Sequence, residues 1–225
     1  MPQPQENADI SPTTDGRLAR GEATRERVLD AAERCFAAKG FEAVSIRQIA
    51  AEAEVTLGVV GFHGGSKEEL FMTVFSRRAA TLHDLRMAAL RNLIARGDMQ
   101  LRDIVDAYLT PYLDIASRGD PQWRAYAQLV AREVARDRFS DGIRELYDPT
   151  ARAFIAQIKT LHPSADATAL ATVLTLTVAS MLSIVASQSR IAGLSDGPAS
   201  DRPMDYREML IDFCTGGIQQ ALGKG

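Results

Sequence analysis

The chain has 225 residues, of which 46% are hydrophobic and 24% are charged, and its formal net charge is -3. A chain of this length can bury a sizeable core without disulfides or a structural metal ion. The acidic balance excludes a uniformly basic surface for nucleic acid, although basic charge concentrated on one face is compatible with it. The two cysteines, Cys35 and Cys214, lie far apart in apolar helical patterns, which predicts free thiols in a reducing, cytoplasmic environment.

Nothing in the sequence indicates catalysis. The three histidines, His63, His83 and His162, have no metal-ligand spacing with one another or with a cysteine. No nucleophile elbow, P-loop or dinucleotide fingerprint occurs, and the "GGSK" stretch at 64–67 lacks the arrangement of a phosphate-binding loop. We therefore expect no enzyme activity, no metal site and no cofactor.

The beginning of the chain differs in character from the rest. Residues 1–21 are mostly polar, contain Pro and Thr, and lack the apolar stretch of a signal peptide. This composition predicts a disordered arm over residues 1–21.

Helical periodicity dominates the remainder, and no alternating run is long enough to predict a strand. Val28, Ala32 and Phe36 mark one face of a first helix, which Gly40 ends. The caps and periodicity predict further helices over 46–53, 57–63, 66–96, 101–118, 121–138, 141–161, 166–191 and 205–221, with a loop over 193–203. The fold class is therefore all-α.

The segment 167–189 is uncharged and long enough to cross a bilayer. Eight Thr and Ser residues interrupt it, however, and a lipid-facing helix gains nothing from so many hydroxyl groups. A helix buried on most sides, whose small residues allow close approach to another helix, fits this pattern better. We expect no membrane association.

Three helix starts crowd into residues 45–70. Ser45 with Gln48 forms one capping box, Thr56 is a second N-cap, and Ser66 with Glu69 forms another capping box. Two short helices joined by a tight turn, after a longer first helix, predict a helix-turn-helix. In that motif the second short helix enters the DNA major groove by its N-terminal end.

The residues of this region also carry a family resemblance. The stretch "TRERVLDAAERCFAAKGFEAVSIRQIAAEAEVTLGVVGFHGGSKEELFMTVF", residues 24–75, resembles the N-terminal DNA-binding domain of the TetR family of transcriptional regulators. The order of its landmarks, "LDAA" and "KGF", then "SIRQIA", "VT" and "FHGGSKEEL", is specific. The resemblance implies a DNA-binding domain over residues 22–70 and a helical effector-binding and dimerisation domain over residues 71–225.

The resemblance also implies individual DNA contacts. Arg47, Thr56 and Lys67 stand where the family contacts phosphates. Hydroxyl groups, helix N-termini and long cations are common phosphate partners. The positions expected to face base edges are Leu57, Gly58 and Val59, and the positions expected against the DNA backbone are Phe62 and His63. Four of these side chains also have a plain structural alternative: Phe62 as a core residue, His63 as a cap or as packing between helices, and Arg47 and Lys67 as solvated surface charges.

Three positions depart from the family pattern. Glu54 occupies a turn position usually held by glycine, so it must adopt or avoid a positive φ. Gly61 and Gly64 replace side chains in the second short helix, where an interior glycine costs about 1 kcal/mol relative to alanine. We expect these glycines to leave the helix loose until DNA orders it; close approach to DNA and partial loss of affinity are the alternatives.

The larger second domain carries no sequence motif that establishes effector binding or dimerisation. Candidates for the lining of an effector pocket are the aromatic and apolar residues of its helices together with one arginine: Tyr108, Tyr112, Trp123, Tyr126, Arg132, Phe154 and Met181. If Arg132 points inward it could pair with a ligand carboxylate. We expect a homodimer through the 166–191 and 205–221 helices, which are poor in charge, with the core of a monomer as the alternative.

Two functional hypotheses follow. The first is a ligand-responsive repressor that binds a palindromic operator in double-stranded DNA as a dimer and is released by a small hydrophobic effector. The second is an all-helical ligand-binding or scaffold protein whose glycine-rich recognition helix has weak or lost DNA affinity. Salt-dependent binding to a palindromic site distinguishes them.

Overall fold

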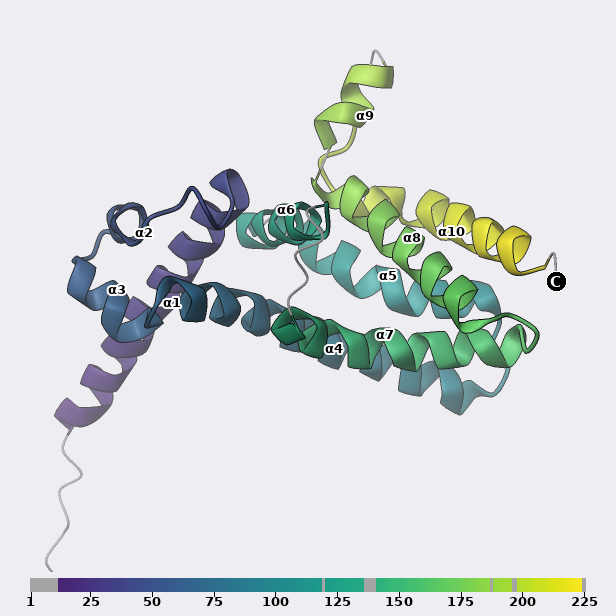
Figure 1. Cartoon of the computed structure of the whole chain (residues 1–225), viewed down its shortest axis with the longest axis horizontal. Helices are drawn as coiled ribbons and strands as arrows, with labels where there is room; N and C mark the ends of the chain where they lie inside the picture. Colours follow the sequence, from purple (N-terminus) through teal and green to yellow (C-terminus); the bar gives the residue numbers. More distant parts are fainter. Residues whose placement is uncertain (1–11, 119, 136–140, 187, 196–197, 224–225) are drawn as a thin grey trace, which may run out of the picture.

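A computed structural model describes residues 12–118, 120–135, 141–186, 188–195 and 198–223. Over these residues the chain forms α-helices and one 3₁₀ helix and contains no strand, as predicted. The helices are α1 (Pro12–Lys39), α2 (Ile46–Glu52), α3 (Leu57–Gly64), α4 (Lys67–Arg96), α5 (Leu101–Ser117), α6 (Pro121–Ala135), α7 (Asp141–Leu161), α8 (Ala167–Ala186), α9 (Gln188–Ser195), η1 (Pro203–Tyr206) and α10 (Arg207–Leu222). In Figure 1, α1 to α3 form one end of the molecule and α5 to α10 the other, with α4 extending between them.

The first helix is longer than the sequence predicted. The expected disordered arm over 1–21 is wrong for residues 12–21, because α1 begins at Pro12 and continues to Lys39. Residues 16–20 are exposed, so tertiary packing does not hold this part of the helix. Once the packed part of α1 has formed, each added residue extends an existing helix and avoids the cost of nucleation. Residues 1–11, the rest of the predicted arm, lie outside the described residues.

The helix-turn-helix forms as its caps predicted. Ser45 and Gln48 complete a capping box on α2, in which the backbone N–H of Gln48 donates to the Ser45 hydroxyl oxygen at 3.3 Å. Ser66 and Glu69 complete the second box at the start of α4, with a backbone-to-carboxylate distance of 2.7 Å. Val44, Ile49 and Val60 are buried beneath these short helices, so the motif packs on α1 as one body.

Several boundaries in the second half differ from the predicted ones. The predicted 166–191 helix is two helices, since α8 ends at Ala186 and α9 begins at Gln188 and projects away from the bundle in Figure 1. The predicted loop over 193–203 therefore starts later, because α9 continues to Ser195. The predicted last turn of the 121–138 helix, residues 136–138, lies outside the described residues.

Helix α8 is the one described helix long and apolar enough to span a membrane by length and composition. Its buried residues recur at helical spacing along one stripe, which packs against α6, α7 and α10. Several of its hydroxyl groups are satisfied within the helix: that of Thr177, for example, donates to the carbonyl oxygen of Val173 at 2.9 Å. This is the arrangement of an amphipathic core helix with one free face.

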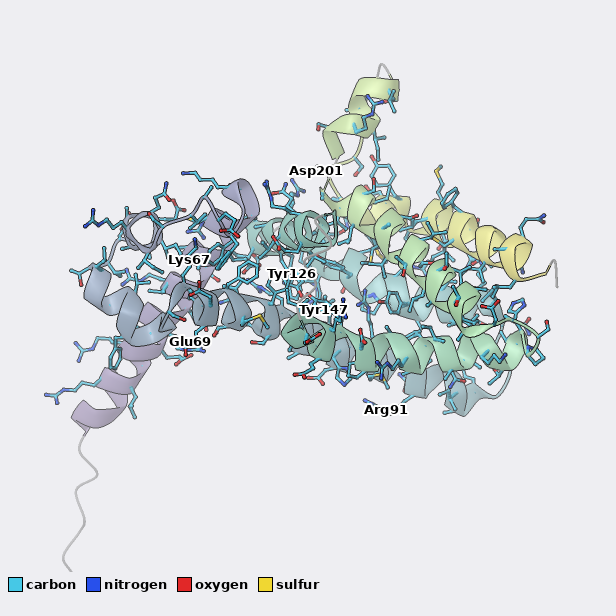
Figure 2. The ribbon with its side chains drawn as sticks, in the orientation of Figure 1. Lys67, Glu69, Arg91, Tyr126, Tyr147 and Asp201 are labelled. Atoms are coloured by element: carbon cyan, nitrogen blue, oxygen red, sulfur yellow. The ribbon has the colours of Figure 1, made fainter. Side chains whose placement is uncertain are left out.

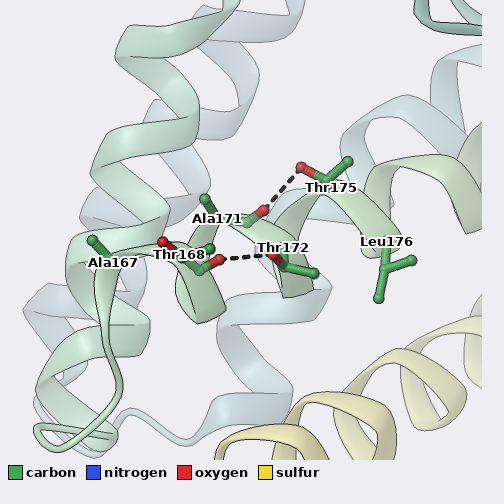
Figure 3. Close-up of a pocket in the computed structure, with 6 residues that line it drawn as sticks. All are labelled: Ala167, Thr168, Ala171, Thr172, Thr175 and Leu176. Atoms are coloured by element: carbon green, nitrogen blue, oxygen red, sulfur yellow. Dashed lines mark hydrogen bonds between the residues drawn. The ribbon is translucent and has the colours of Figure 1, made fainter.

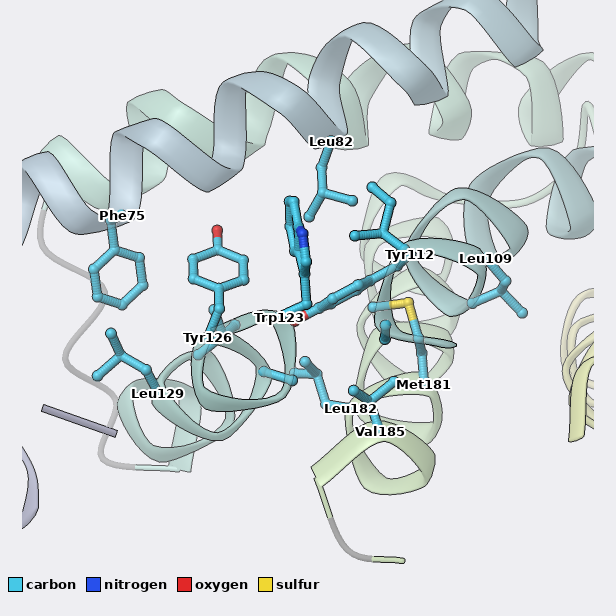
Figure 4. Close-up of a cluster of buried hydrophobic side chains, with 14 of the residues drawn as sticks. Phe75, Leu82, Leu109, Tyr112, Trp123, Tyr126, Leu129, Met181, Leu182 and Val185 are labelled. Carbon is cyan, nitrogen blue, oxygen red and sulfur yellow. The ribbon is translucent and has the colours of Figure 1, made fainter. Parts of the chain in front are cut away.

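A continuous core runs through both ends of the molecule. Phe36, Phe71 and Phe75 form successive ring contacts of 5.1 and 4.9 Å between α1 and α4, and Phe75 continues to Tyr126 on α6 at 6.0 Å. Figure 4 shows this cluster passing from Phe75 and Tyr126 to the residues of α5 and α8. The helix-turn-helix end and the larger helical end therefore share one hydrophobic core.

A buried polar group sits beside this core. The carboxylate of Glu33 on α1 is fully buried and lies 2.8 Å from the Arg77 guanidinium and 3.1 Å from that of Arg78, both on α4. Gln122 on α6 reaches the same carboxylate at 3.4 Å. Burial raises the pKa of Glu33 and the two guanidinium groups lower it, with a net value above the usual 4.5. We call these four residues the Glu33 junction.

Neutralising the junction should destabilise the whole fold. Glu33→Gln keeps the size of the side chain but leaves the two largely buried arginines with only the partly exposed carboxylates of Asp30 and Glu26 as partners. Removing one partner of a buried ion pair costs about 3–5 kcal/mol. We expect a loss of that size in the free energy of unfolding, measured by chemical denaturation.

Glu26→Gln is the matched control. Glu26 also contacts Arg77, at 2.6 Å, but its side chain is 45% exposed. An exposed pair contributes about 1 kcal/mol or less, so this variant should stay close to the parent protein. Equal losses in the two variants would contradict the role assigned to burial.

Candidate functional site

The exposed face of α3 is apolar and lacks bulky side chains at two positions. Phe62 is 85% exposed and Leu57 is 50% exposed, so neither belongs to the core. Gly58 and Gly61 are open on the same helix, with no atom near the position that a Cβ would occupy. A helix with a flat, exposed N-terminal half can approach the edges of bases in a major groove.

Cations and a hydroxyl group flank this helix. Arg47 is exposed near the start of α2, and Thr56 is exposed at the N-cap of α3. Thr56 is the N-cap residue of α3, as predicted, but its side chain makes no capping hydrogen bond, so its hydroxyl group is available. Lys67, at the start of α4 (Figure 2), lies 4.4 Å from the centre of the Phe41 ring and donates to the Glu42 carbonyl oxygen at 3.4 Å.

Two predicted contact residues face partly inward. Val59 is half-buried and packs against the core, so only part of its side chain is available to a base edge. His63 is half-buried at the end of α3, and its ring meets that of Phe62 edge-on at 4.9 Å. The structure therefore brings the eight predicted DNA-contact residues to one end of the molecule with unequal exposure.

The turn between α2 and α3 accepts the unusual residue at its centre. Glu54 has a φ of 54°, the only positive φ at a non-glycine residue within the described segments. This left-handed conformation is uncommon outside glycine. Its amide still donates to the Ala51 carbonyl oxygen at 3.2 Å, so the turn closes in the usual way.

The two glycines of α3 that depart from the family pattern have different surroundings. A Cβ added at Gly61 would meet open space. A Cβ added at Gly64 would lie 2.9 Å from Cδ1 of Leu70, which is fully buried on α4. Close packing of α3 on α4 thus accounts for Gly64, whereas nothing in the packing accounts for Gly61.

A cavity of about 540 Å³ lies in the larger helical end, between α4, α5, α6, α7 and α8. Four of the predicted pocket residues line it, namely Tyr108, Tyr112, Tyr126 and Met181. In Figure 4, three of them, Tyr112, Tyr126 and Met181, belong to the same buried cluster as Leu82. The aromatic composition of these helices was therefore a useful guide to part of the cavity.

Three predicted pocket residues lie elsewhere. Trp123 stacks on the Arg78 guanidinium at 4.8 Å, and Phe154 packs edge-on against Tyr108 at 4.9 Å from outside the cavity lining. Arg132 points away, and its guanidinium donates to the carbonyl oxygens of Ala37 and Ala38 at 3.3 and 3.2 Å. Carbonyl groups at a helix C-terminus attract cations, so Arg132 caps α1 and does not face a ligand.

The prediction missed five polar residues of the cavity lining, Arg86, Arg144, Tyr147, Asp148 and Thr175. Arg86 was detectable, because it follows Leu82 by four residues and precedes Leu90 by four on the buried stripe of α4. An arginine at a core position of an amphipathic helix needs a local partner or a functional reason.

The cavity is connected physically to the helix-turn-helix end of the molecule. Helix α6 contributes Tyr126 and Val130 to the cavity lining. The same helix packs along α1, where Gln122 donates to the Asp30 carbonyl oxygen at 3.1 Å. A ligand that shifts α6 must therefore shift α1 or break these contacts.

The fold and the exposed second helix of the helix-turn-helix define a DNA-binding transcriptional regulator. The family model described as "Bacterial regulatory proteins, tetR family" matches residues 28–74, and that described as "Tetracyclin repressor-like, C-terminal domain" matches residues 106–217. Together the two matches cover more than two thirds of the chain. The chain belongs to the TetR family, and it is a regulator and not an enzyme.

Named relatives agree with this assignment. The chain is 28% identical over 125 residues to the transcriptional repressor AcnR of Corynebacterium glutamicum, covering 53% of this chain and 66% of that protein. It is 31% identical over 99 residues to the transcriptional repressor NicS of Pseudomonas putida, covering 44% of this chain and 46% of that protein. The alignments thus span between about half and two thirds of these relatives' own length.

Solved structures show the same fold. The hemolysin II transcriptional regulator HlyIIR superposes with a TM-score of 0.57 at 19% identity, covering 87% of this chain and 98% of that one. The fatty acid degradation regulator FadR of Bacillus halodurans superposes with a TM-score of 0.57 at 12% identity, covering 86% and 95%. At these identities the likeness concerns the fold alone.

The two α3 glycines should respond oppositely to alanine. Gly61→Ala fills open space on a helix and should stabilise the protein by about 0.5–1 kcal/mol. Gly64→Ala forces the buried Leu70 side chain to move and should destabilise it by about 1–3 kcal/mol. Chemical denaturation of both variants measures these changes, and a stabilising Gly64→Ala would contradict the packing explanation.

Proposed function

We propose that this protein is a cytoplasmic repressor that binds a palindromic operator in double-stranded DNA as a homodimer and is released by a small hydrophobic effector. The observation that carries the proposal is the exposed apolar face of α3, with Leu57 and Phe62 uncovered beside Arg47, Thr56 and Lys67. An exposed aromatic side chain on a capped short helix has no structural purpose within the monomer. Contact with DNA explains why this aromatic side chain is exposed.

The proposed dimer uses α8 and α10. Leu176 on α8 is 61% exposed, and Met209 and Phe213 on α10 are 75% and 70% exposed. Beside Leu176 an open groove of about 460 Å³ runs along α8, lined by Ala167, Thr168, Ala171, Thr172, Thr175 and Leu176 (Figure 3). Large exposed apolar residues next to a groove of small residues are complementary when two copies meet, so this face supports a four-helix seam.

Dimerisation also fits the requirements of DNA recognition. One α3 reads one half-site, and half-sites lie about 34 Å or a multiple of that apart. A second copy related by a two-fold axis supplies the second α3, which is why the operator is expected to be palindromic. The cavity between α4 and α8 is the proposed effector site, and α6 is the proposed link to the spacing of the two DNA-binding ends.

DNA binding should depend steeply on salt and on two cations. We expect tight binding, by fluorescence anisotropy, to one labelled fragment from upstream of the protein's own coding region. Replacing both Arg47 and Lys67 with alanine should remove two phosphate contacts and lower the slope of log affinity against log salt by about 2. Arg91→Ala is the control, because Arg91 is an exposed arginine of α4 beyond the DNA-binding end (Figure 2).

The same measurement separates the two functional hypotheses. Binding no tighter than to random DNA of equal length would contradict the repressor and favour an all-helical ligand-binding or scaffold protein. Unchanged affinity in the Arg47 and Lys67 double variant would contradict the proposed placement of the DNA on α2 to α4.

The proposed dimer interface of α8 and α10 can be tested by a single substitution. A carboxylate placed at the centre of an apolar interface is buried without a partner, so Phe213→Glu should convert the dimer to a monomer. Light scattering coupled to size-exclusion chromatography measures the mass. Ile94→Glu is the control, since Ile94 is 49% exposed on α4 and lies outside the proposed seam. A dimer that survives Phe213→Glu would place the interface elsewhere.

A further inference from the structure

A buried arginine faces the cavity. Arg86 on α4 is only 4% exposed and is part of the cavity lining. Its Nε donates to the Tyr108 carbonyl oxygen at 2.8 Å, and its Nη2 lies 3.6 Å from the Met181 sulfur. The guanidinium also stacks on the Tyr108 ring, 3.9 Å from its centre. These contacts hold the side chain in place without neutralising its charge.

No carboxylate within the described part of the chain pairs with Arg86. Asp148 lines the same cavity, but its carboxylate bonds to the exposed Arg152 at 3.0 Å. Arg86 differs in this from the arginines of the Glu33 junction, which share a buried carboxylate. A buried cation without an ion-pair partner is strongly unfavourable, because desolvation removes the hydration that stabilised the charge.

An unpartnered hydroxyl group accompanies this charge. Tyr112 lines the same cavity, and its hydroxyl group is buried and has no hydrogen-bond partner among the described residues. Burial raises the pKa of Tyr112 well above its usual value of 10, so this hydroxyl remains a neutral donor. The hydroxyl groups of Tyr126 and Tyr147, in contrast, are hydrogen-bonded to each other. The cavity thus offers one unpaired cation and one unpaired donor.

The remainder of the lining is largely apolar. Apart from the tyrosines, the two arginines, Asp148 and Thr175, the residues that line the cavity are apolar: Leu82, Val130, Ala151, Leu174, Val178, Ala179, Met181 and Leu182. A guanidinium forms short, paired hydrogen bonds with a planar carboxylate. From these observations we infer that the cavity binds an organic monocarboxylate with an apolar body, whose carboxylate pairs with Arg86 and accepts a hydrogen bond from the Tyr112 hydroxyl group.

The charge of the lining limits the ligand to one acid group. The other lining arginine, Arg144, is 58% exposed and lies beside Asp141 at 3.9 Å. The lining carboxylate of Asp148 repels a second anionic group. A dicarboxylate or a phosphate ester would leave one charge against aliphatic side chains, which is unfavourable. The inference rests on the proposed function in one respect: it identifies this monocarboxylate as the effector.

The test compares acids with their neutral isosteres. The full-length protein is titrated by isothermal titration calorimetry with benzoate, 4-phenylbutyrate, octanoate and dodecanoate, and separately with the primary amide of each acid. We expect at least one acid to bind at least about tenfold more tightly than its amide. Arg86→Met should reduce that acid-to-amide ratio to about one, and Arg86→Lys should keep part of it because the charge remains. Arg91→Met removes an exposed charge from the same helix and should leave the ratio unchanged.

Tyr112→Phe keeps the inference testable if Arg86→Met does not fold. Removing a buried hydroxyl group that has no partner should not lower the free energy of unfolding. The same change should weaken binding of the preferred acid by about three- to tenfold while leaving its amide less affected. The inference is overturned if no acid of the panel binds, if amides bind as tightly as acids, or if the acid preference survives Arg86→Met.

Failure of the effector role is distinguishable from failure of the anion site. The preferred acid is added to the protein bound to its labelled operator fragment, and the anisotropy is followed. Release of the DNA by the acid and not by its amide supports both the anion site and the effector role. If the acid binds in a way that depends on Arg86 but the DNA stays bound, the anion site is established. In that case the acid is not the effector of the proposed repressor.

Discussion

The Glu33 junction is the constraint on which the rest of the structure depends. One fully buried carboxylate of α1 meets Arg77 and Arg78 of α4 and Gln122 of α6, so three helices from both ends of the molecule converge on it. A buried charge group of this kind tolerates little displacement, because any gap leaves a desolvated charge without its partner. The DNA-binding end therefore moves with α4 and α6 and not independently of them.

This arrangement places α6 between the cavity and the helix-turn-helix end of the molecule. Its inner residues Tyr126 and Val130 line the cavity, while Arg132 holds the last carbonyl groups of α1. The cavity and the helix-turn-helix are joined through packed helices with short polar contacts between them. Packed interfaces change by discrete rearrangements more readily than by continuous deformation, so a displacement of α6 would move its neighbouring helices as whole units.

Local signals in the sequence were reliable where the structure is local. The capping boxes at Ser45 and Ser66 formed as predicted, because each needs only residues three apart. At Glu54 the sequence showed only that a residue other than glycine occupies the turn, and the structure decided that it adopts a positive φ of 54°. The N-terminal extension of α1 and the break of the 166–191 segment into α8 and α9 were not predicted, because exposed polar stretches have similar local preferences in a helix and in a loop.

The sequence by itself determined the all-helical class and the helix-turn-helix, because caps, periodicity and turn chemistry act over a few neighbouring residues. Only the tertiary structure decided which side chains meet across helices. It placed Arg132 on the end of α1 and Arg86 in the cavity, although both are arginines on amphipathic helices. The reason is physical: the environment of a charge depends on what packs against its helix, and that is set by residues distant in the chain.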